Sequence, residues 1–276
     1  MEETRVTIII PTVGKHTKLL RAVDSVIANK GKVIIVNDGG PSFEIHENPH
    51  LIDVAELKVN QGPSAARNYG ASRANTEFVG FLDSDDYFMD GKIEEQVKIL
   101  EKYRSAVCLS NYILRISETV EFKHTFSESL KIENFYNEKF GFPNTSAHLW
   151  RKSDFFSVGG FDEELKQSED LELLLRAAVK YNKEIRVSQS LGYVFDGSSE
   201  ASLSRTFNYE RLVNNRKAIR KLHFLSDNRN IAAYLFFRMA RADLRYLRYY
   251  TSSELYLTLC WAAKSLAKRM VCIVNR

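Results

Sequence analysis

The fold of this chain is decided by one stretch, Phe78-Val79-Gly80-Phe81-Leu82-Asp83-Ser84-Asp85-Asp86-Tyr87. Its first half is apolar and aromatic, which is typical of a strand buried on both faces of a sheet. Its second half places three carboxylates within four residues, and burying such charges is costly unless a cation or hydrogen bonds offset them. The pattern predicts that the acidic half lies at the carboxyl end of the strand, where open α/β sheets bind their ligands.

The acidic residues have two interpretations. Alternate residues of an extended chain point the same way, so Asp83 and Asp85 can present their carboxylates on one face. Oxygen ligands of this kind suit Mg²⁺ or Mn²⁺, held with the help of substrate phosphates. The alternative is an acidic turn in which Asp86 or Asp90 caps a helix over residues 91–103. The spacing alone leaves both interpretations open.

The length of the chain and its cysteines limit the classes of protein to which it can belong. The 276 residues are enough for one large α/β domain and an appendage. Cys108, Cys260 and Cys272 are odd in number and far apart, which argues against a disulfide framework and fits a reducing compartment. The start of the chain shows no signal peptide, and no uncharged run approaches the ~20 residues of a membrane-spanning helix. We therefore expect a cytoplasmic protein.

The net charge of +4 conceals two segments of opposite sign. Residues 205–276 carry 15 Lys and Arg against 4 Asp and Glu, whereas residues 1–204 carry 24 against 31. Segments of opposite charge usually do different jobs. With the boundary in the polar stretch 196–205, we predict an α/β domain over residues 1–205 and a basic helical region over residues 206–276.

The chain opens with a strand, a helix and a second strand, which predicts parallel pairing with a right-handed crossover. Gly62-Pro63 is expected to turn the chain, and Ser64 to cap the next helix, whose N-terminus is a fair anion site. Apolar spacing and β-branched runs predict the other elements. The expected strands cover residues 6–12, 32–37, 55–59, 78–82, 106–115, 185–188 and 192–195; the expected helices cover 15–29, 64–74, 91–103, 153–158 and one starting at 168–170; a hairpin with loops fills 116–141.

Three positions are candidates for chemistry, each with a structural alternative. Asp38 can accept a hydrogen bond from a nucleobase or cap the Gly39-Gly40 turn, and the turn is favoured. Arg67 can contact phosphate or ribose or be a charge on a helix surface, and the surface is favoured. Asp170, with Glu169 at a helix start, can be a general base or simply a favourable charge at the helix dipole.

Other signals are weaker or absent. His148 stands alone and is weak evidence of a site, and Trp150 is favoured as a core residue over a sugar-stacking platform. The chain lacks the glycine-rich dinucleotide and Walker sequences, His-Glu-x-x-His and Gly-x-Ser-x-Gly. Their absence disfavours dinucleotide oxidoreductases, P-loop NTPases, zincins and α/β-hydrolases.

An ordered set of motifs is more specific than any one of them. The set comprises the strand at 6–12, Val36-Asn37-Asp38-Gly39-Gly40, Asn60-Gln61-Gly62-Pro63-Ser64-Ala65-Ala66-Arg67-Asn68, Phe81-Leu82-Asp83-Ser84-Asp85-Asp86, Gly159-Gly160-Phe161-Asp162-Glu163 and Ser168-Glu169-Asp170. Over about residues 5–205 it closely resembles the family 2 glycosyltransferases, which are inverting enzymes. The resemblance implies a GT-A fold, which is an α/β, Rossmann-like, mostly parallel central sheet flanked by helices, here with a C-terminal helical appendage.

The resemblance also implies a site for a nucleotide-diphosphate-sugar donor, with UDP as the expected nucleotide. Asp83 and Asp85 match the family's Asp-x-Asp motif and would hold Mn²⁺ or Mg²⁺, with Asp85 the direct ligand. Asp170 matches the family's catalytic base. The donor would be bound by Pro11, Thr12, Asp38, Asn60, Arg67, Asp83 and Ser84.

The sequence departs from the family at two points. Many relatives carry a His after the last sheet strand that approaches the metal or diphosphate, whereas residues 193–202 here contain none. Asp196 or a water is the candidate substitute. The turn at residues 37–40 has Asn and Gly where relatives often have a second acid and Ser, which leaves the identity of the base open.

Residues 206–276 lie outside the resemblance. Arg238, Arg241, Arg245 and Arg248 form a basic stripe on one predicted helix face. Basic, aromatic-rich helices can lie on anionic membranes, which would dock the enzyme at the cytoplasmic membrane face near a lipid-linked acceptor. The alternatives are a helical cap on the catalytic domain or a homo-oligomer interface. Nucleic acid is not an expected partner, because no recognition module accompanies the charge.

Together these features predict a metal-dependent inverting glycosyltransferase that acts on a glycan or glycolipid acceptor, in bacterial surface polysaccharide synthesis. Within enzymes, the alternative is a nucleotide-sugar pyrophosphorylase or hydrolase. From another class, the alternative is a nucleotide-sugar-binding scaffold without catalysis. Irregular loops between residues 116 and 150 are expected to shape the acceptor site.

Overall fold

The computed structural model describes residues 4–130, 144–165, 169–181 and 185–196. The predicted helical region over residues 206–276, its basic stripe and the proposed domain boundary lie outside these ranges. Within the described residues, no helix is both long and apolar enough to cross a membrane.

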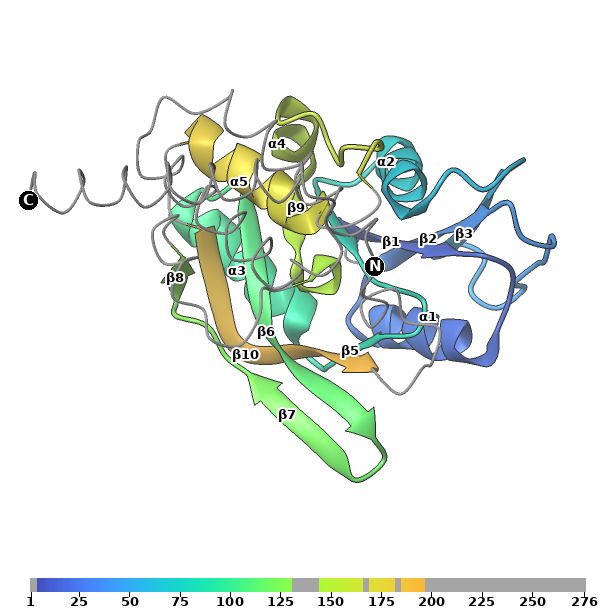
Figure 1. Ribbon diagram of the computed structural model, residues 1–276, viewed down its shortest axis with the longest axis horizontal. Helices are drawn as coiled ribbons and strands as arrows, with labels where there is room; N and C mark the ends of the chain where they lie inside the picture. Colours follow the sequence, from blue (N-terminus) through green and yellow to red (C-terminus); the bar gives the residue numbers. More distant parts are fainter. Residues whose placement is uncertain (1–3, 131–143, 166–168, 182–184, 197–276) are drawn as a thin grey trace, which may run out of the picture.

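A mixed sheet runs through the centre of the molecule (Figure 1). Its strand order is β3-β2-β1-β4-β9-β6-β10-β5, with β7 on β6 and β8 on β10. Pairing is parallel from β3 to β4, and β9 is the antiparallel strand between β4 and β6. The strands are β1 (Val6–Thr12), β2 (Lys32–Asp38), β3 (Ile52–Leu57), β4 (Phe78–Phe81), β5 (Tyr87–Phe88), β6 (Val107–Ser117), β7 (Val120–His124), β8 (Ser129–Leu130), β9 (Leu149–Arg151) and β10 (Ile185–Asp196).

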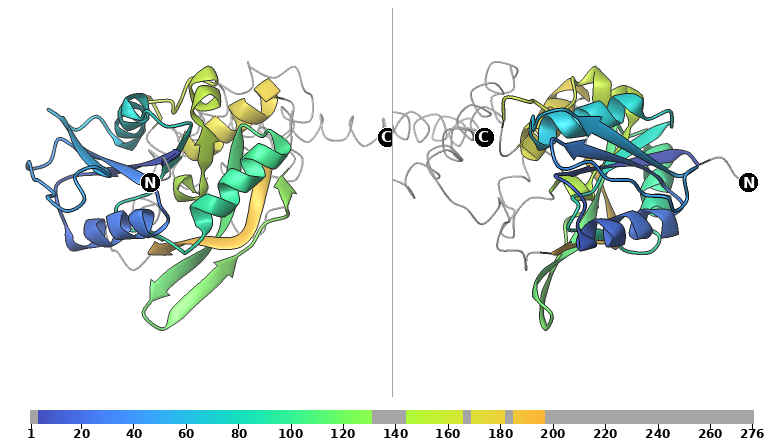
Figure 2. Two further views of the ribbon diagram at one scale, coloured as in Figure 1. Left: turned by 180° about the vertical axis from the view of Figure 1, so that it is seen from behind. Right: turned by 90° about the vertical axis from the view of Figure 1, so that its right-hand side faces the viewer.

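Helices cover both faces of this sheet, which confirms the predicted α/β class (Figures 1 and 2). Helices α2, α4 and α5 lie together on one face, and α1 and α3 lie on the other. The helices are α1 (Thr17–Ala28), α2 (Pro63–Arg73), α3 (Lys92–Tyr103), α4 (Lys152–Ser157) and α5 (Glu169–Tyr181), with a short 3₁₀ turn, η2 (Thr145–Ala147).

Helix α2 packs on the sheet through small residues. Its buried positions include Ala65, Ala66, Gly70 and Ala71. A Cβ atom at Gly70 would lie 2.5 Å from Ile9 Cγ2, so only glycine permits this approach of helix to strand. The close packing brings the side chains of α2 to the carboxyl ends of β1 and β4.

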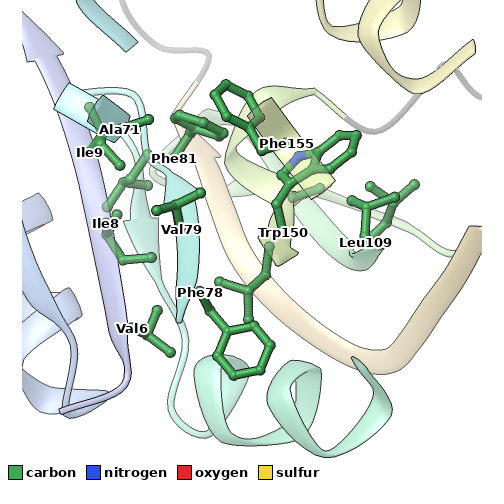
Figure 3. Packing of buried hydrophobic residues seen from close by; sticks show 14 of the residues in the cluster. Val6, Ile8, Ile9, Ala71, Phe78, Val79, Phe81, Leu109, Trp150 and Phe155 are labelled. Atoms are coloured by element: carbon green, nitrogen blue, oxygen red, sulfur yellow. The ribbon is translucent and has the colours of Figure 1, made fainter. Parts of the chain in front are cut away.

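An aromatic cluster supports the end of β4 from the same face (Figure 3). The Phe81 ring lies 5.3 Å from Phe155 of α4 and 4.9 Å from Phe161, between ring centroids. Trp150 of β9 is fully buried and packs edge-on against Phe155, as expected of a core residue. Offset and edge-on aromatic pairs add about 0.5–1.5 kcal/mol each beyond their buried area. The acidic residues after β4 therefore start from a rigid base.

Several element boundaries differ from prediction. The third strand covers Ile52–Leu57 rather than 55–59, because its whole length pairs with β2. Helix α2 starts at Pro63 with Gly62 as N-cap, so Ser64 is inside the helix and does not cap it. The strands expected at 185–188 and 192–195 are one strand, β10, with irregular pairing between Ser188 and Tyr193. The hairpin predicted after residue 115 is confirmed by the pairing of β6 with β7.

The helix-capping interpretation of the acidic stretch is wrong. Helix α3 has Gly91 as its N-cap, in the left-handed conformation with φ of 79°, and no side chain caps it. Asp90 is exposed at this point. Asp86 is fully buried and bonded elsewhere. The carboxylates after β4 therefore have another role.

Candidate active site

The parallel strands β1, β2 and β4 end at one edge of the sheet, and the loops that follow them meet there. Pro11 and Thr12 close β1, Asp38 closes β2, and Asp83 follows β4 by two residues. This is the edge at which open α/β sheets bind ligands. The structure thus gathers the predicted donor-binding residues of three separate segments.

The ends of β1 and β2 interlock through glycines. Thr12 Oγ1 donates a hydrogen bond to the Gly14 carbonyl at 2.7 Å, and the Gly14 N–H donates to Asn37 Oδ1 at 2.9 Å. A Cβ atom on Gly40 would lie 2.2 Å from Gly14 N, so this turn has no room for a side chain. Val13, which is 62% exposed, stands beside the turn. The two loops form a fixed, apolar-edged surface.

Asp38 is buried and tied to the loop before α2. Its two carboxylate oxygens accept the backbone N–H groups of Gln61 at 2.7 Å and Gly62 at 2.8 Å. Asn60 Nδ2 donates to the Asp38 carbonyl at 3.1 Å. The carboxylate therefore caps a different loop from the Gly39-Gly40 turn that we favoured. Its use in reading a nucleobase stays a prediction.

Arg67 joins the end of β4 to the start of α5. Its side chain is 5% exposed, and its guanidinium donates to Asp83 at 2.6 Å and to Glu169 at 3.0 Å. Burial opposes its charge, but Asp83 and Glu169 outweigh burial and raise the pKa of Arg67. The surface location that we favoured is wrong. Asp83 and the Glu169-Asp170 pair, far apart in sequence, meet across one arginine.

The three aspartates after β4 have different surroundings. Asp86 is fully buried and accepts hydrogen bonds from Ser146 Oγ at 2.8 Å and from the Asp196 N–H at 3.0 Å. Burial, with the charges of Asp83 and Asp85, raises the pKa of Asp86 well above its ordinary value. This carboxyl group fastens the acidic loop to η2 and to the end of β10.

Asp85 is the carboxylate best placed to receive a cation. It is half-buried, and burial and the Asp83 charge raise the pKa of its carboxyl group. Its carbonyl accepts a hydrogen bond from Arg21 at 2.8 Å. In the described ranges no three His, Cys, Asp or Glu side chains form a ready metal cluster. A divalent cation here would therefore take one or two protein carboxylates and complete its shell with ligand oxygens and water.

Asp170 lies in the first turn of α5, where the helix N-terminus favours negative charge. Its carboxylate accepts the Leu171 N–H at 2.7 Å. Burial, followed by the charge of Glu169, raises the pKa of Asp170 to about 7. A carboxyl group with that pKa takes and releases a proton near neutral pH, as a general base must.

The start of α1 adds residues that the sequence analysis did not identify. His16 Nε2 lies 3.1 Å from Ser84 Oγ. In the sequence, Ser84 stands between the two candidate metal ligands Asp83 and Asp85. Lys18 Nζ at 3.1 Å and Arg21 at 3.0 Å both bind the Asp196 carboxylate. Their position in the sequence was the available signal, because these residues follow β1 and therefore lie at the same edge of the sheet as the other candidates.

The Asp196 carboxylate, considered as a substitute metal ligand, is therefore already neutralised by two cations. His148 is fully buried, with its ring 6.3 Å from that of Trp150. This location fits polar packing, and His148 is not among the residues gathered at the edge of the sheet.

Comparison with known proteins shows the family of the chain. Residues 7–161, more than half of the chain, match the family described as Glycosyl transferase family 2. An uncharacterized glycosyltransferase of Bacillus subtilis, YwdF, is 26% identical over 211 residues, which cover 71% of this chain and 76% of that protein. Glycosyltransferase GlyA of Streptococcus pneumoniae is 29% identical over 137 residues, 46% of this chain and 20% of GlyA. In uncharacterized Rickettsia glycosyltransferases the match spans only about a fifth of their length, 18% in Rickettsia felis and 21% in Rickettsia bellii.

Solved structures show the same fold. TarS 1–349 of S. aureus in complex with UDP-GlcNAc superposes with a TM-score of 0.68 at 20% identity, covering 84% of this chain and 72% of TarS 1–349. The TarS complex with UDP gives a TM-score of 0.65 at 19% identity, covering 84% and 71%. The predicted GT-A fold is thereby confirmed. By its family match over residues 7–161, the chain belongs to glycosyl transferase family 2.

Proposed function

We propose that this protein is an inverting glycosyltransferase that moves a sugar from UDP-sugar to a hydroxyl group of a glycan or glycolipid. The observation that carries the proposal is the bridge made by Arg67. It holds Asp83, at the donor edge of the sheet, next to the helix start that bears the base candidate Asp170. A donor and a proton acceptor can thus act on the same reacting carbon.

The nucleoside would lie against the interlocked loops after β1 and β2. Val13 and Val59 are 62% and 64% exposed and flank the Gly39-Gly40 turn, which offers apolar contact to a base. Pro11, Thr12 and Asn60 line the same edge and would contact the nucleoside. TarS binds UDP and UDP-GlcNAc on the same fold, which supports a uridine nucleotide.

The carboxylates after β4 fit Mn²⁺ or Mg²⁺. Asp85 would be the direct ligand and Asp83 would assist, with Ser84 next to the diphosphate. When bound, the cation would counter the negative charge that grows on the leaving diphosphate. Arg67 keeps Asp83 in place, and its buried positive charge adds to the same stabilisation.

Asp170 would take the proton from the acceptor hydroxyl as its oxygen attacks the anomeric carbon. The new carbon–oxygen bond forms on the face opposite the bond to the diphosphate, which breaks with its electron pair going to the diphosphate. The carbon is inverted in one displacement, and no covalent enzyme intermediate forms. The acceptor must therefore approach from the α5 side of the site.

We also propose a place for this activity. The acceptor would belong to bacterial surface polysaccharide or glycolipid synthesis, and residues 206–276 would dock the enzyme on the membrane surface. Flotation with anionic vesicles, using the full chain and a chain ending at residue 205, tests the docking. Equal recovery of both chains would contradict it.

A nucleotide-sugar panel tests the function. A ligand at 100 times its Kd stabilises the folded state by about 2.7 kcal/mol, which raises the Tm by roughly 5–10 °C for a chain of this size. With Mn²⁺ present, we expect UDP and one UDP-sugar to give the largest shifts, and the UDP-sugar then to yield a glycoside only when acceptor is added. No shift with any nucleotide-sugar, or cleavage of the donor without need of an acceptor, would refute the proposal.

A further inference from the structure

The donor edge of the sheet is strongly acidic for a site that must bind an anion. Among the described residues, the cationic side chains that form ion pairs with carboxylates of this edge include Arg67, Lys18 and Arg21. A diphosphate brought here is repelled by the carboxylates unless a cation reaches it. The carboxyl groups number six, Asp83, Asp85, Asp86, Glu169, Asp170 and Asp196, and the raised pKa values of Asp85, Asp86 and Asp170 lower the negative charge that they carry together.

Two of the three cations are each held by several partners, although the Nε atom of each guanidinium has no hydrogen-bond partner among the described residues. Arg67 is 5% exposed and has Asp83 on one side of its fork and Glu169 on the other. Arg21 donates to the Asp85 carbonyl and to Asp196, and its guanidinium lies 4.5 Å from the centre of the Tyr87 ring.

Lys18 differs from both arginines in the number of its partners. Its side chain is 33% exposed, against 39% for Arg21, and its ion-pair partner within the described residues is Asp196, at 3.1 Å. An ammonium group has three N–H donors, so one such pair leaves donors for a ligand. Burial raises the pKa of Asp85, and the Lys18 charge opposes this rise. The Lys18 ammonium and the Asp85 carboxylate are therefore within electrostatic range of each other.

His16 lies next to Lys18 on this side of the site, where burial and the Lys18 charge lower the pKa of its imidazole. It occupies the N-cap of α1, yet its side chain makes no cap hydrogen bond. Instead the imidazole reaches out to Ser84 Oγ at 3.1 Å. His16 and Lys18 therefore both lie close to the Ser84-Asp85 segment.

We propose that Lys18, with His16 beside it, contacts the diphosphate of the nucleotide donor. The inference rests on the proposed function and adds two donor-binding residues to it. Lys18 would bind the diphosphate oxygens directly, and this interaction would strengthen as negative charge develops on the diphosphate. Its pair with Asp196 would hold the ammonium in place before the donor arrives.

Calorimetric titration with uridine and UDP, in EDTA and in Mn²⁺, tests the contact. We expect Lys18→Met to weaken UDP binding about 10- to 100-fold in both buffers, the range for a charge-assisted hydrogen bond, and to leave uridine binding unchanged. Lys18→Arg should retain most of the UDP affinity. Lys15→Met is the matched control, because Lys15 is exposed in the loop just before α1, and it should bind both ligands like the wild type. His16→Ala should lower UDP affinity by a smaller factor than Lys18→Met.

The outcomes separate the two claims. Unchanged UDP affinity in Lys18→Met, or equal weakening for uridine and UDP, would overturn the contact while the proposed function stands. If Lys18→Met fails to fold, Lys18→Arg provides the test. A Lys18→Arg protein that binds uridine normally but binds UDP about 10- to 100-fold more weakly than the wild type would also overturn the contact. No binding of UDP to the wild-type protein would overturn the proposed function itself.

Discussion

Replacing Asp170 by Asn should make the protein more stable and catalytically inactive. The folded protein raises the pKa of this carboxyl group from 3.8 to about 7. The folded state therefore holds the proton more tightly than the unfolded chain does, and ionisation destabilises the fold as pH rises between these values. A shift of about three units corresponds to about 4 kcal/mol. Because Asp170 keeps part of its surface in water, we expect a gain of about 1–2 kcal/mol in Asp170→Asn at neutral pH.

Urea denaturation at about pH 5 and about pH 8 measures this gain. The gain in free energy of unfolding of Asp170→Asn over the wild type should be larger at pH 8 than at pH 5. At about pH 8 the Tm of the variant should be higher by roughly 2–8 °C. Asp24→Asn is the control, because Asp24 is exposed on α1, and its stability should follow the wild type at both pH values.

Activity should move in the opposite direction. Loss of a general base lowers the transfer rate by about 10²- to 10⁴-fold, while UDP affinity should stay at the wild-type level. In the wild type, the transfer rate should rise as pH increases through about 7, where Asp170 becomes ionised. An Asp170→Asn protein that is less stable at pH 8, or that transfers sugar at the wild-type rate, would refute the reasoning.

Three further changes have defined outcomes. Arg67→Met leaves Asp83 and Glu169 facing each other without a cation, so we expect a loss of about 3 kcal/mol in urea denaturation; a loss below about 0.5 kcal/mol would contradict the buried bridge. Asp85→Asn should abolish the gain in UDP affinity that Mn²⁺ gives the wild type, as EDTA should; a persisting Mn²⁺ effect in calorimetry would exclude Asp85 as ligand. Burial lowers the pKa of Lys92 from 10.5 to about 7, so its protonation opposes folding and wild-type stability should gain from rising pH between these values. This pH-dependent gain in stability should be missing in Lys92→Met. If the free energy of unfolding depends on pH in the same way in both proteins, Lys92 makes no such contribution.

The fold was largely predictable because its first half alternates β-branched runs with amphipathic helices. The strand at Val6–Thr12 and the helix at Thr17–Ala28 were predicted within about two residues. The two-residue strand β5 was not expected, because Tyr87–Phe88 is too short to show a period. The start of β3 was missed because a strand boundary depends on pairing with its neighbour, here along β2.

The location of Asp83 and Asp85 was predictable, because both follow directly after a buried strand; their role as metal ligands stays a prediction. Arg67 was misplaced because α2 buries small residues, so no apolar stripe marks its inner face. Its partner Glu169 is 102 residues away, and only the tertiary structure brings them together. Lys18 and His16 lie at the start of a helix whose sequence shows only an apolar core stripe, and their partners Asp196 and Ser84 are also distant in sequence.

The central claim is that the carboxylates at the end of β4 receive the metal and the diphosphate of a nucleotide donor. Anomalous diffraction from crystals grown with Mn²⁺ and UDP measures this directly. The account predicts one Mn²⁺ peak in contact with the Asp85 carboxylate and with both phosphates of UDP, and the uridine against the loops after β1 and β2. A Mn²⁺ peak away from Asp85, with UDP bound at another face of the sheet, would contradict it.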